Sequence, residues 1–147
     1  MNHTIKSFTR ADIAPCTELY VNVFNAKPWN EEWSYEIAEE RLRDLYMTPK
    51  FCGLTLYDGK NPAGFIGGNK KQTPQGVVFY IAELCIARPA QGQGAGSVLT
   101  DALEEKLRLE KVSGIYLITS RDGPAERFYL KNNYVLNNNR IIMKKNF

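Results

Sequence analysis

Residues 84–107 read LCIARPAQGQGAGSVLTDALEEKL. The stretch begins with apolar, β-prone residues, passes through a glycine-rich loop at 91–97, and ends in a segment with apolar residues at helical spacing. This order predicts a strand, a loop and a helix. The predicted buried stripe of the helix consists of Val98, Leu99, Ala102, Leu103 and Leu107.

Three glycines at alternate positions, Gly92, Gly94 and Gly96, determine what this loop can bind. Because they lack Cβ atoms, they let a ligand approach the backbone, and they allow dihedral angles that are closed to other residues. The helix that follows offers unpaired N–H groups and the positive end of its dipole in its first turn. The loop is therefore predicted to bind an anion, most naturally the phosphate of a phosphorylated ligand.

Two common kinds of phosphate-binding loop do not match. A P-loop ends in Gly-Lys-Ser/Thr, whereas Gly96 is followed by Ser97 and Val98. A dinucleotide fingerprint needs a third glycine where this chain has Ser97, and it should open a parallel βαβ series near the N-terminus. The pattern that remains is Gln-x-x-Gly-x-Gly, at Gln91, Gly94 and Gly96.

That pattern resembles the coenzyme A pyrophosphate loop of the GNAT acetyltransferases. The resemblance extends to residues 125–134, AERFYLKNNY, which are similar to the family's Ala-x-x-Phe-Tyr-x-x-x-Gly-Phe segment. Asn133 stands where glycine is usual, and Asp122 stands where many members carry asparagine. The specific match covers roughly residues 77–134.

The resemblance implies a co-substrate, acetyl-CoA, and a place for it. In the family's fold the central strand and the strand near Ile115 splay apart, and the thioester arm lies in the gap. Strand carbonyls and amides would then hydrogen-bond the pantetheine chain. The residues implied to contact the cofactor are Leu84, Cys85, Ile86, Gln91, Gly92, Gln93, Gly94, Ala95, Gly96, Ser97 and Asp122.

Length and composition exclude several other classes of protein. A chain of 147 residues has the size of one domain, predicted here as residues 1–147, and its net charge of +3 without a basic run argues against nucleic acid. Cys16, Cys52 and Cys85 are odd in number and widely spaced, so neither a disulfide framework nor a metal site is predicted. No signal pattern or membrane-length apolar run is present, so we expect a cytoplasmic protein without membrane contact.

Apolar periodicity along the chain predicts the order βααβββαβαββ. This is an α/β (α+β) fold with a mixed central sheet flanked by helices, and it is also the order expected of a GNAT domain. Strands are predicted at 4–9, 51–57, 63–69, 77–87, 115–119, 134–136 and 140–145, the last two as a hairpin. Helices are predicted after Asp12 as cap, at 31–46 with Asn30 as N-cap, at 97–109 and from Pro124. One side of the second helix carries Ile37, Ala38, Arg41, Leu42 and Leu45.

Acetyl transfer to an amine requires a base, because an alkylamine with a pKa of about 10 is protonated at neutral pH. Glu83 is the candidate, since it interrupts an apolar strand where desolvation should raise its pKa. An ion pair at the sheet surface is the alternative. Tyr129 matches the family's general-acid tyrosine, which would donate to the leaving thiolate, against the alternative of a core tyrosine. A backbone N–H near Cys85 or Ile86 would stabilise the oxyanion.

The acceptor site is predicted in residues 27–36, where aromatic side chains and carboxylates are concentrated. Trp29, Glu32 and Trp33 are the candidate substrate residues, because aromatic faces and carboxylates suit a cationic amine. The function predicted is an acyltransferase, an N-acetyltransferase that moves acetyl from acetyl-CoA to a small-molecule primary amine. Acetylation of a peptide or protein amine and a non-catalytic coenzyme A-binding module are the alternatives. The oligomeric state stays open, with a homodimer among the options.

Overall fold

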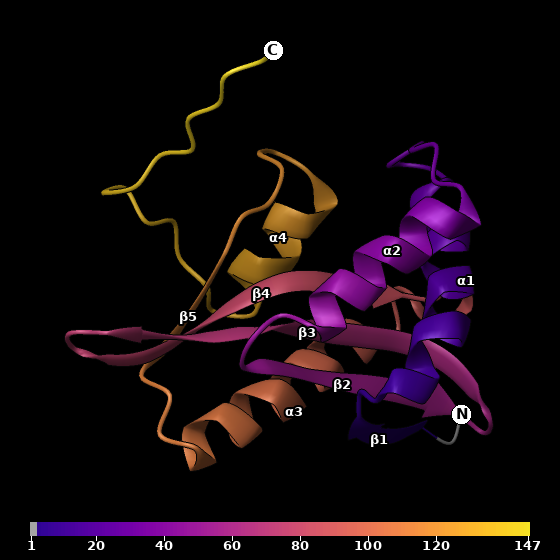
Figure 1. The fold of residues 1–147 in the computed structure, drawn as a ribbon, viewed down its shortest axis with the longest axis horizontal. Coiled ribbons are helices and arrows are strands. Elements are labelled where there is room, and N and C mark those ends of the chain that lie inside the picture. Colours follow the sequence, from indigo (N-terminus) through magenta and orange to yellow (C-terminus); the bar gives the residue numbers. More distant parts are fainter. Residues whose placement is uncertain (1–2) are drawn as a thin grey trace.

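A five-stranded mixed sheet forms the centre of the computed structural model, which describes residues 3–147 (Figure 1). Its strands are β1 (His3–Ser7), β2 (Phe51–Asp58), β3 (Asn61–Thr73), β4 (Gly76–Ile86) and β5 (Gly114–Leu117). They follow one another across the sheet in sequence order. β1 to β4 are antiparallel neighbours, whereas β5 runs parallel to β4.

Helices cover both faces of the sheet, and this confirms the α/β class expected from the sequence. Within residues 3–147 the α-helices are α1 (Ile13–Phe24), α2 (Tyr35–Tyr46), α3 (Ala95–Leu109) and α4 (Pro124–Lys131). α1 and α2 lie on one face and α3 on the other (Figure 1). Phe65 packs with α1 and α2 in one core cluster, and Phe79 packs with α3 in the other. None of the described helices is long and apolar enough to cross a bilayer.

The predicted start of α2 was wrong by four residues. Asn30 has a φ of 51° and caps nothing, whereas the hydroxyl of Ser34 accepts a hydrogen bond from the Ile37 N–H at 3.2 Å. The reason is Asn25, whose side-chain amide bonds both the N–H and the carbonyl of Trp33, at 2.8 and 2.9 Å. These two bonds hold the connection in a loop conformation until Ser34.

Strand ends also differ from the prediction. The turn between β2 and β3 is shorter than expected, and β3 continues to Thr73, four residues beyond its predicted end at residue 69. Asp12 does not cap α1 with its side chain. Its carboxylate instead accepts from the Thr9 N–H and from the Tyr57 hydroxyl, a partner on β2 that no local pattern reveals.

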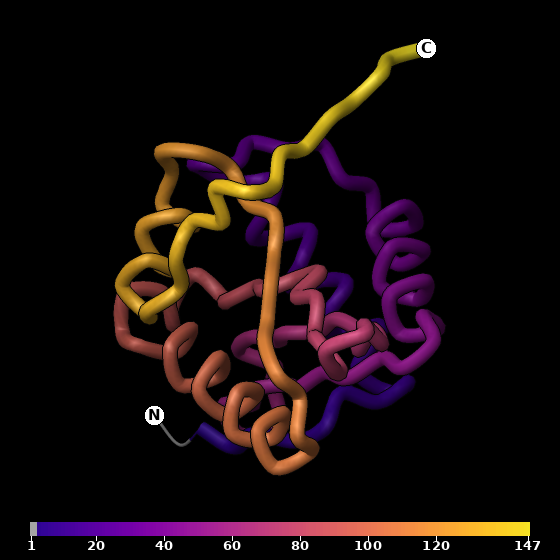
Figure 2. Tube along the Cα trace, turned by 90° about the vertical axis from the view of Figure 1, so that its left-hand side faces the viewer, coloured from indigo at the N-terminus to yellow at the C-terminus, as the bar shows by residue number. Residues whose placement is uncertain are grey.

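The predicted C-terminal hairpin does not form. No strand follows β5 within the described residues, and the chain after α4 is extended and exposed. Figures 1 and 2 show this segment leaving the body of the molecule beyond β5. Two β-prone segments are not stable as an isolated hairpin, because they need a further strand or a helix to pack against.

The position of the site follows from how β4 and β5 pair. Their ladder begins at Val78 with Gly114 and ends at Ile81 with Leu117, although β4 continues to Ile86. On the other edge of β4 the register with β3 shifts, so that Ala82 is an extra residue in the ladder. Such a bulge twists the strand and re-aims the side chain beside it. A gap consequently opens between β4 and the chain that follows β5.

Candidate active site

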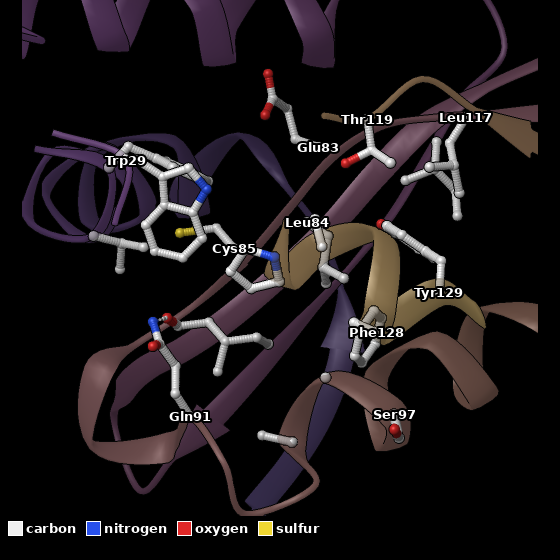
Figure 3. Close-up of a pocket in the computed structure, with 18 of the residues that line it drawn as sticks. Trp29, Glu83, Leu84, Cys85, Gln91, Ser97, Leu117, Thr119, Phe128 and Tyr129 are labelled. Atoms are coloured by element: carbon white, nitrogen blue, oxygen red, sulfur yellow. Dashed lines mark hydrogen bonds between the residues drawn. The ribbon is translucent and has the colours of Figure 1, made fainter. Parts of the chain in front are cut away.

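A cavity of about 490 Å³ lies in this gap. Its walls come from the second half of β4, the glycine loop and start of α3, the chain after β5, the start of α4, and the end of α1 with the loop behind it. Figure 3 shows Glu83 at one end of the cavity and Gln91 with Ser97 at the opposite end. The cavity brings together most of the predicted residues, namely Trp29, Glu83, Leu84, Cys85, Ile86, Gln91, Gly92, Gly94, Ala95, Gly96, Ser97 and Tyr129.

The glycine loop has the geometry that an anion site requires. Gly92 and Gly94 have φ angles of 73° and 83°, in the left-handed region that other residues avoid. The space in front of both residues is open, since a Cβ on either would meet no atom within 4 Å. The first helical hydrogen bond of α3 runs from Val98 N–H to the Gly94 carbonyl, so the N–H groups of the preceding residues are available to a ligand. The loop therefore fits the phosphate groups of coenzyme A.

One edge of β4 is available along the cavity. Ala87 N–H donates to the Ala63 carbonyl at 2.8 Å, and Cys85 stands opposite Phe65 in the β3 ladder. Because polar groups alternate along a strand, those of Leu84 and Ile86 face away from β3, toward the cavity. The Ile86 carbonyl already accepts from the side chain of Gln91 at 2.8 Å. This edge can pair with an amide-containing chain such as pantetheine.

The two sequence segments that resemble the family meet at Gly96. A Cβ at this glycine would lie 3.0 Å from the ring of Phe128, so the start of α3 packs directly on α4. That contact places Tyr129, the next residue of α4, at the cavity. Figure 3 shows its hydroxyl turned toward the space between Leu84 and Thr119.

Tyr129 is a buried phenol. Burial raises its pKa above the ordinary value, and the negative charge of Glu83 raises it further. The hydroxyl is therefore fully protonated at neutral pH. A phenol of raised pKa is a weaker acid, so it is better suited to donate a hydrogen bond to a developing thiolate than to release its proton early.

Glu83 is also buried, with 11% of its side chain exposed. One carboxylate oxygen lies 2.9 Å from the Nε of Arg41, and the Tyr20 hydroxyl lies 3.4 Å from both oxygens. Burial raises the pKa of Glu83 above its ordinary range, while the charge of Arg41 and the hydrogen bonds oppose that rise. The group is a carboxylate with increased basicity, held in a fixed orientation.

Arg41 and Tyr20 surround Glu83, and neither was predicted from the sequence to be functional. Arg41 also lies over the ring of Trp33, with 5.6 Å from guanidinium carbon to ring centroid. Lys71 does not line the cavity: its ammonium lies 5.1 Å from the Tyr80 ring and 2.7 Å from the Tyr116 hydroxyl. For Arg41 a signal existed in the sequence: it is the charged residue within the otherwise apolar side of α2.

The three predicted substrate residues separate in the structure. Trp29 lines the cavity, where its ring packs edge-on against Phe24. Trp33 contacts Tyr20, a partner of Glu83, and its indole N–H donates to Glu31 at 2.7 Å. Glu32 is exposed and is not among the residues that line the cavity.

Three further predicted residues have distinct surroundings. Gln93 and Asp122 do not line the cavity: the side chain of Gln93 donates to the Pro89 carbonyl, and Asp122 has a φ of 61° in the turn before α4. Cys85 is 2% exposed, and burial raises the pKa of its thiol well above the ordinary value. A thiol in this state is a small apolar side chain rather than a nucleophile.

The sequence and the fold match known acetyltransferases. The acetyltransferase (GNAT) family model matches residues 13–134. The comparison with curated proteins gives no match.

Among solved structures, a possible acetyltransferase from Clostridium difficile 630 is 11% identical with a TM-score of 0.83, over 100% of this chain and 99% of that chain. An aminoglycoside acetyltransferase from an uncultured soil metagenomic sample is 16% identical with a TM-score of 0.76, over 99% and 96%. The ribosomal-protein-alanine N-acetyltransferase from Brucella melitensis biovar Abortus 2308 is 16% identical with a TM-score of 0.74, over 99% of both chains. Identities this low establish a common fold alone.

Proposed function

Because the chain belongs to the acetyltransferase (GNAT) family, we propose that it transfers the acetyl group of acetyl-CoA directly to the primary amine of a small molecule. Membership makes the chain an acyltransferase, and acetyl-CoA is the co-substrate of the family. Bound acetyl-CoA supplies the activated acetyl thioester. The residues around the cavity support a role for each part of the transfer.

Binding of the donor is assigned to backbone groups. The N–H groups at the start of α3 bind the pyrophosphate, and the open edge of β4 at Leu84 and Ile86 pairs with the pantetheine amides. With the arm held in this way, Glu83 and Tyr129 would both face its sulfur end, since both line the cavity. An N–H of the open edge donates to the acetyl oxygen as negative charge develops there.

Glu83 acts as the general base. It accepts a proton from the substrate ammonium, either directly or through a water, and this frees the nitrogen lone pair for attack on the thioester carbon. Its raised pKa brings its basicity closer to that of the amine. As the carbon–nitrogen bond forms and the carbon–sulfur bond breaks, the Tyr129 hydroxyl donates a hydrogen bond to the leaving sulfur. The nitrogen then loses its second proton to solvent, and the coenzyme A thiolate leaves and takes up a proton from solvent.

The charges near Glu83 favour an acceptor with one ammonium group. Glu83 and Glu31 carry negative charge, and Arg41, which pairs with Glu83, carries positive charge. These three charges leave a net charge of −1, which suits one ammonium group rather than a polycation. A monoamine, including one that carries a carboxylate near Arg41, is the expected substrate.

The observation that carries the proposal is the position of Glu83 and Tyr129 on one cavity, with the open edge of β4 between them. The test is thiol release from acetyl-CoA in the presence of an amine panel of monoamines, amino acids, short peptides, polyamines and aminoglycosides. We expect turnover with small monoamines or amino acids. Turnover restricted to peptides would favour the protein-amine alternative, and tight coenzyme A binding without release for any amine would favour the non-catalytic module.

A further inference from the structure

The C-terminal segment of the chain, residues 135–147, leaves a large apolar surface uncovered. Val135, Ile141 and Met143 are 86%, 82% and 84% exposed, and Leu136 and Ile142 are exposed as well. Isolated apolar side chains are common on protein surfaces, but an extended segment with this many in succession is not. Residues 140–145 read RIIMKK, a pattern typical of a strand. A segment of this kind is expected to have a partner.

The structure contains a matching surface on the same chain. β5 is the last strand of the sheet within residues 3–147, so one of its edges carries unpaired backbone groups. That edge has none of the charges or prolines that protect exposed strands, since Gly114–Leu117 reads GIYL and is followed by Ile118, which is exposed.

A hollow of about 480 Å³ lies beside the start of β5. Its apolar lining is Leu107 on α3, Val112 after α3, Ile115 on β5, and Tyr134 after α4, and its polar lining includes Glu104, Arg108, Asn132 and Asn133. A strand added to the outer edge of β5 would direct alternate side chains over this hollow. The tail supplies such side chains in Ile141 and Met143.

The tail does not reach its own β5 edge in the structure. Tyr134 is held by its backbone N–H on the Tyr129 carbonyl and by its hydroxyl on Glu104. The chain bends at Asn138–Asn139, and Figures 1 and 2 show the residues after the bend directed away from the body. A second copy of this chain carries the same tail and the same open edge, so a two-fold pair would satisfy both surfaces on both copies.

We propose that two copies of the chain exchange their C-terminal tails. Residues 140–145 of each copy pair as a strand with the outer edge of β5 of the other, and the apolar side chains of the tail cover the hollow there. The exchange completes the sheet that the sequence predicts, with the last strand supplied by the partner.

The first test is the mass of the full chain in solution. Sedimentation velocity from about 1 µM to about 100 µM should show a dimer that dissociates on dilution. Ile142→Pro removes a backbone donor from the strand and should weaken the dimer at least about tenfold. Asn146→Pro, beyond the strand, is the matched control and should leave the dimer intact. A wild-type monomer at the highest concentration, or an unchanged Ile142→Pro dimer, would overturn the proposal.

The second test separates exchange from folding of the tail onto its own sheet. Hydrogen exchange of the wild-type chain is measured at a high and a low protein concentration. Exchange between copies predicts slow amides in residues 140–145 and 115–117 that become fast together on dilution. Protection that is independent of concentration would indicate folding back within one chain, and no protection at any concentration would indicate no pairing; both results contradict the proposal.

Discussion

The two ends of the cavity are built in different ways. The proposed donor end is made of backbone groups from neighbouring stretches, the open edge of β4 and the loop that follows it. The proposed acceptor end is made of side chains brought together from α1, α2 and β4, as Tyr20, Arg41 and Glu83 show. Backbone groups are present whatever the side chains are, so recognition by them tolerates substitutions nearby. Recognition by side chains changes with each substitution.

Substitution of Glu83 should have the largest effect on turnover, and it should leave binding of acetyl-CoA at the donor end nearly unchanged. Glu83→Gln keeps the shape and removes the base, so kcat should fall by about 10²-fold or more, whereas the KM for acetyl-CoA should change little. Steady-state kinetics with the best amine of the panel gives both constants. Glu105→Gln, an exposed acid on α3 that pairs with Arg108, is the control and should retain turnover. Full activity of Glu83→Gln would assign the residue to an ion pair only.

Tyr129 lies where the two ends meet, and its substitution should have a smaller effect. Tyr129→Phe removes one hydrogen bond to the leaving sulfur, which is worth about 1.5–3 kcal/mol when the acceptor is charged, so kcat should fall by about 10- to 100-fold. Tyr134→Phe is the matched control, because that hydroxyl bonds Glu104 away from the cavity at 3.0 Å. Equal kinetics for the two variants would indicate that Tyr129 is a packing residue.

The difference between a donor end built from neighbouring backbone and an acceptor end built from distant side chains also decides what could be predicted from the sequence. The loop with Gly94 and Gly96 and the interrupting Glu83 are local features, and both were visible before the structure. Lys71 and Tyr80 meet only because β3 continues past residue 69, its predicted end, and pairs Lys71 with Val78 on β4. No local pattern encodes such a register.

The ends of elements that depend on distant partners could not be predicted from the sequence either. The start of α2 depends on the side chain of Asn25, eight residues before Trp33. The C-terminal hairpin was predicted from propensity alone, but a strand needs an edge to pair with, and the segment after α4 is directed away from the open edge of β5 (Figures 1 and 2). Most of the sheet order and the family were therefore predictable, whereas the acceptor end and the last strands were not.

The pH dependence tests whether Arg41 belongs to the acceptor end. Glu83 must be ionised to act as a base, so kcat is lost as pH falls through its pKa in the folded protein. Arg41 lowers that pKa against the larger effect of burial. Arg41→Gln removes the positive charge, so the pKa should rise and the acidic limb of the kcat profile should move up by about one pH unit.

The same amine is used for wild type and variant, so that its own ionisation cancels. Arg43→Gln on the same helix is the control, because Arg43 pairs with Glu39 and not with Glu83. An acidic limb that stays in place in Arg41→Gln would show that Arg41 does not influence the base.

The smallest effect is expected at the donor end, from Gly94→Ala. A left-handed residue with a Cβ costs roughly 1–2 kcal/mol, and relief of that strain by rearrangement of the loop should raise the KM for acetyl-CoA about fivefold with kcat preserved. Gly59, in the turn between β2 and β3, has a φ of 63° and equally open surroundings. Gly59→Ala should therefore cost a similar free energy of folding, which lowers the thermal midpoint, and it should leave KM unchanged. If both variants leave KM unchanged, the backbone of the loop does not bind the donor, and recognition at this end would depend on side chains as it does at the acceptor end.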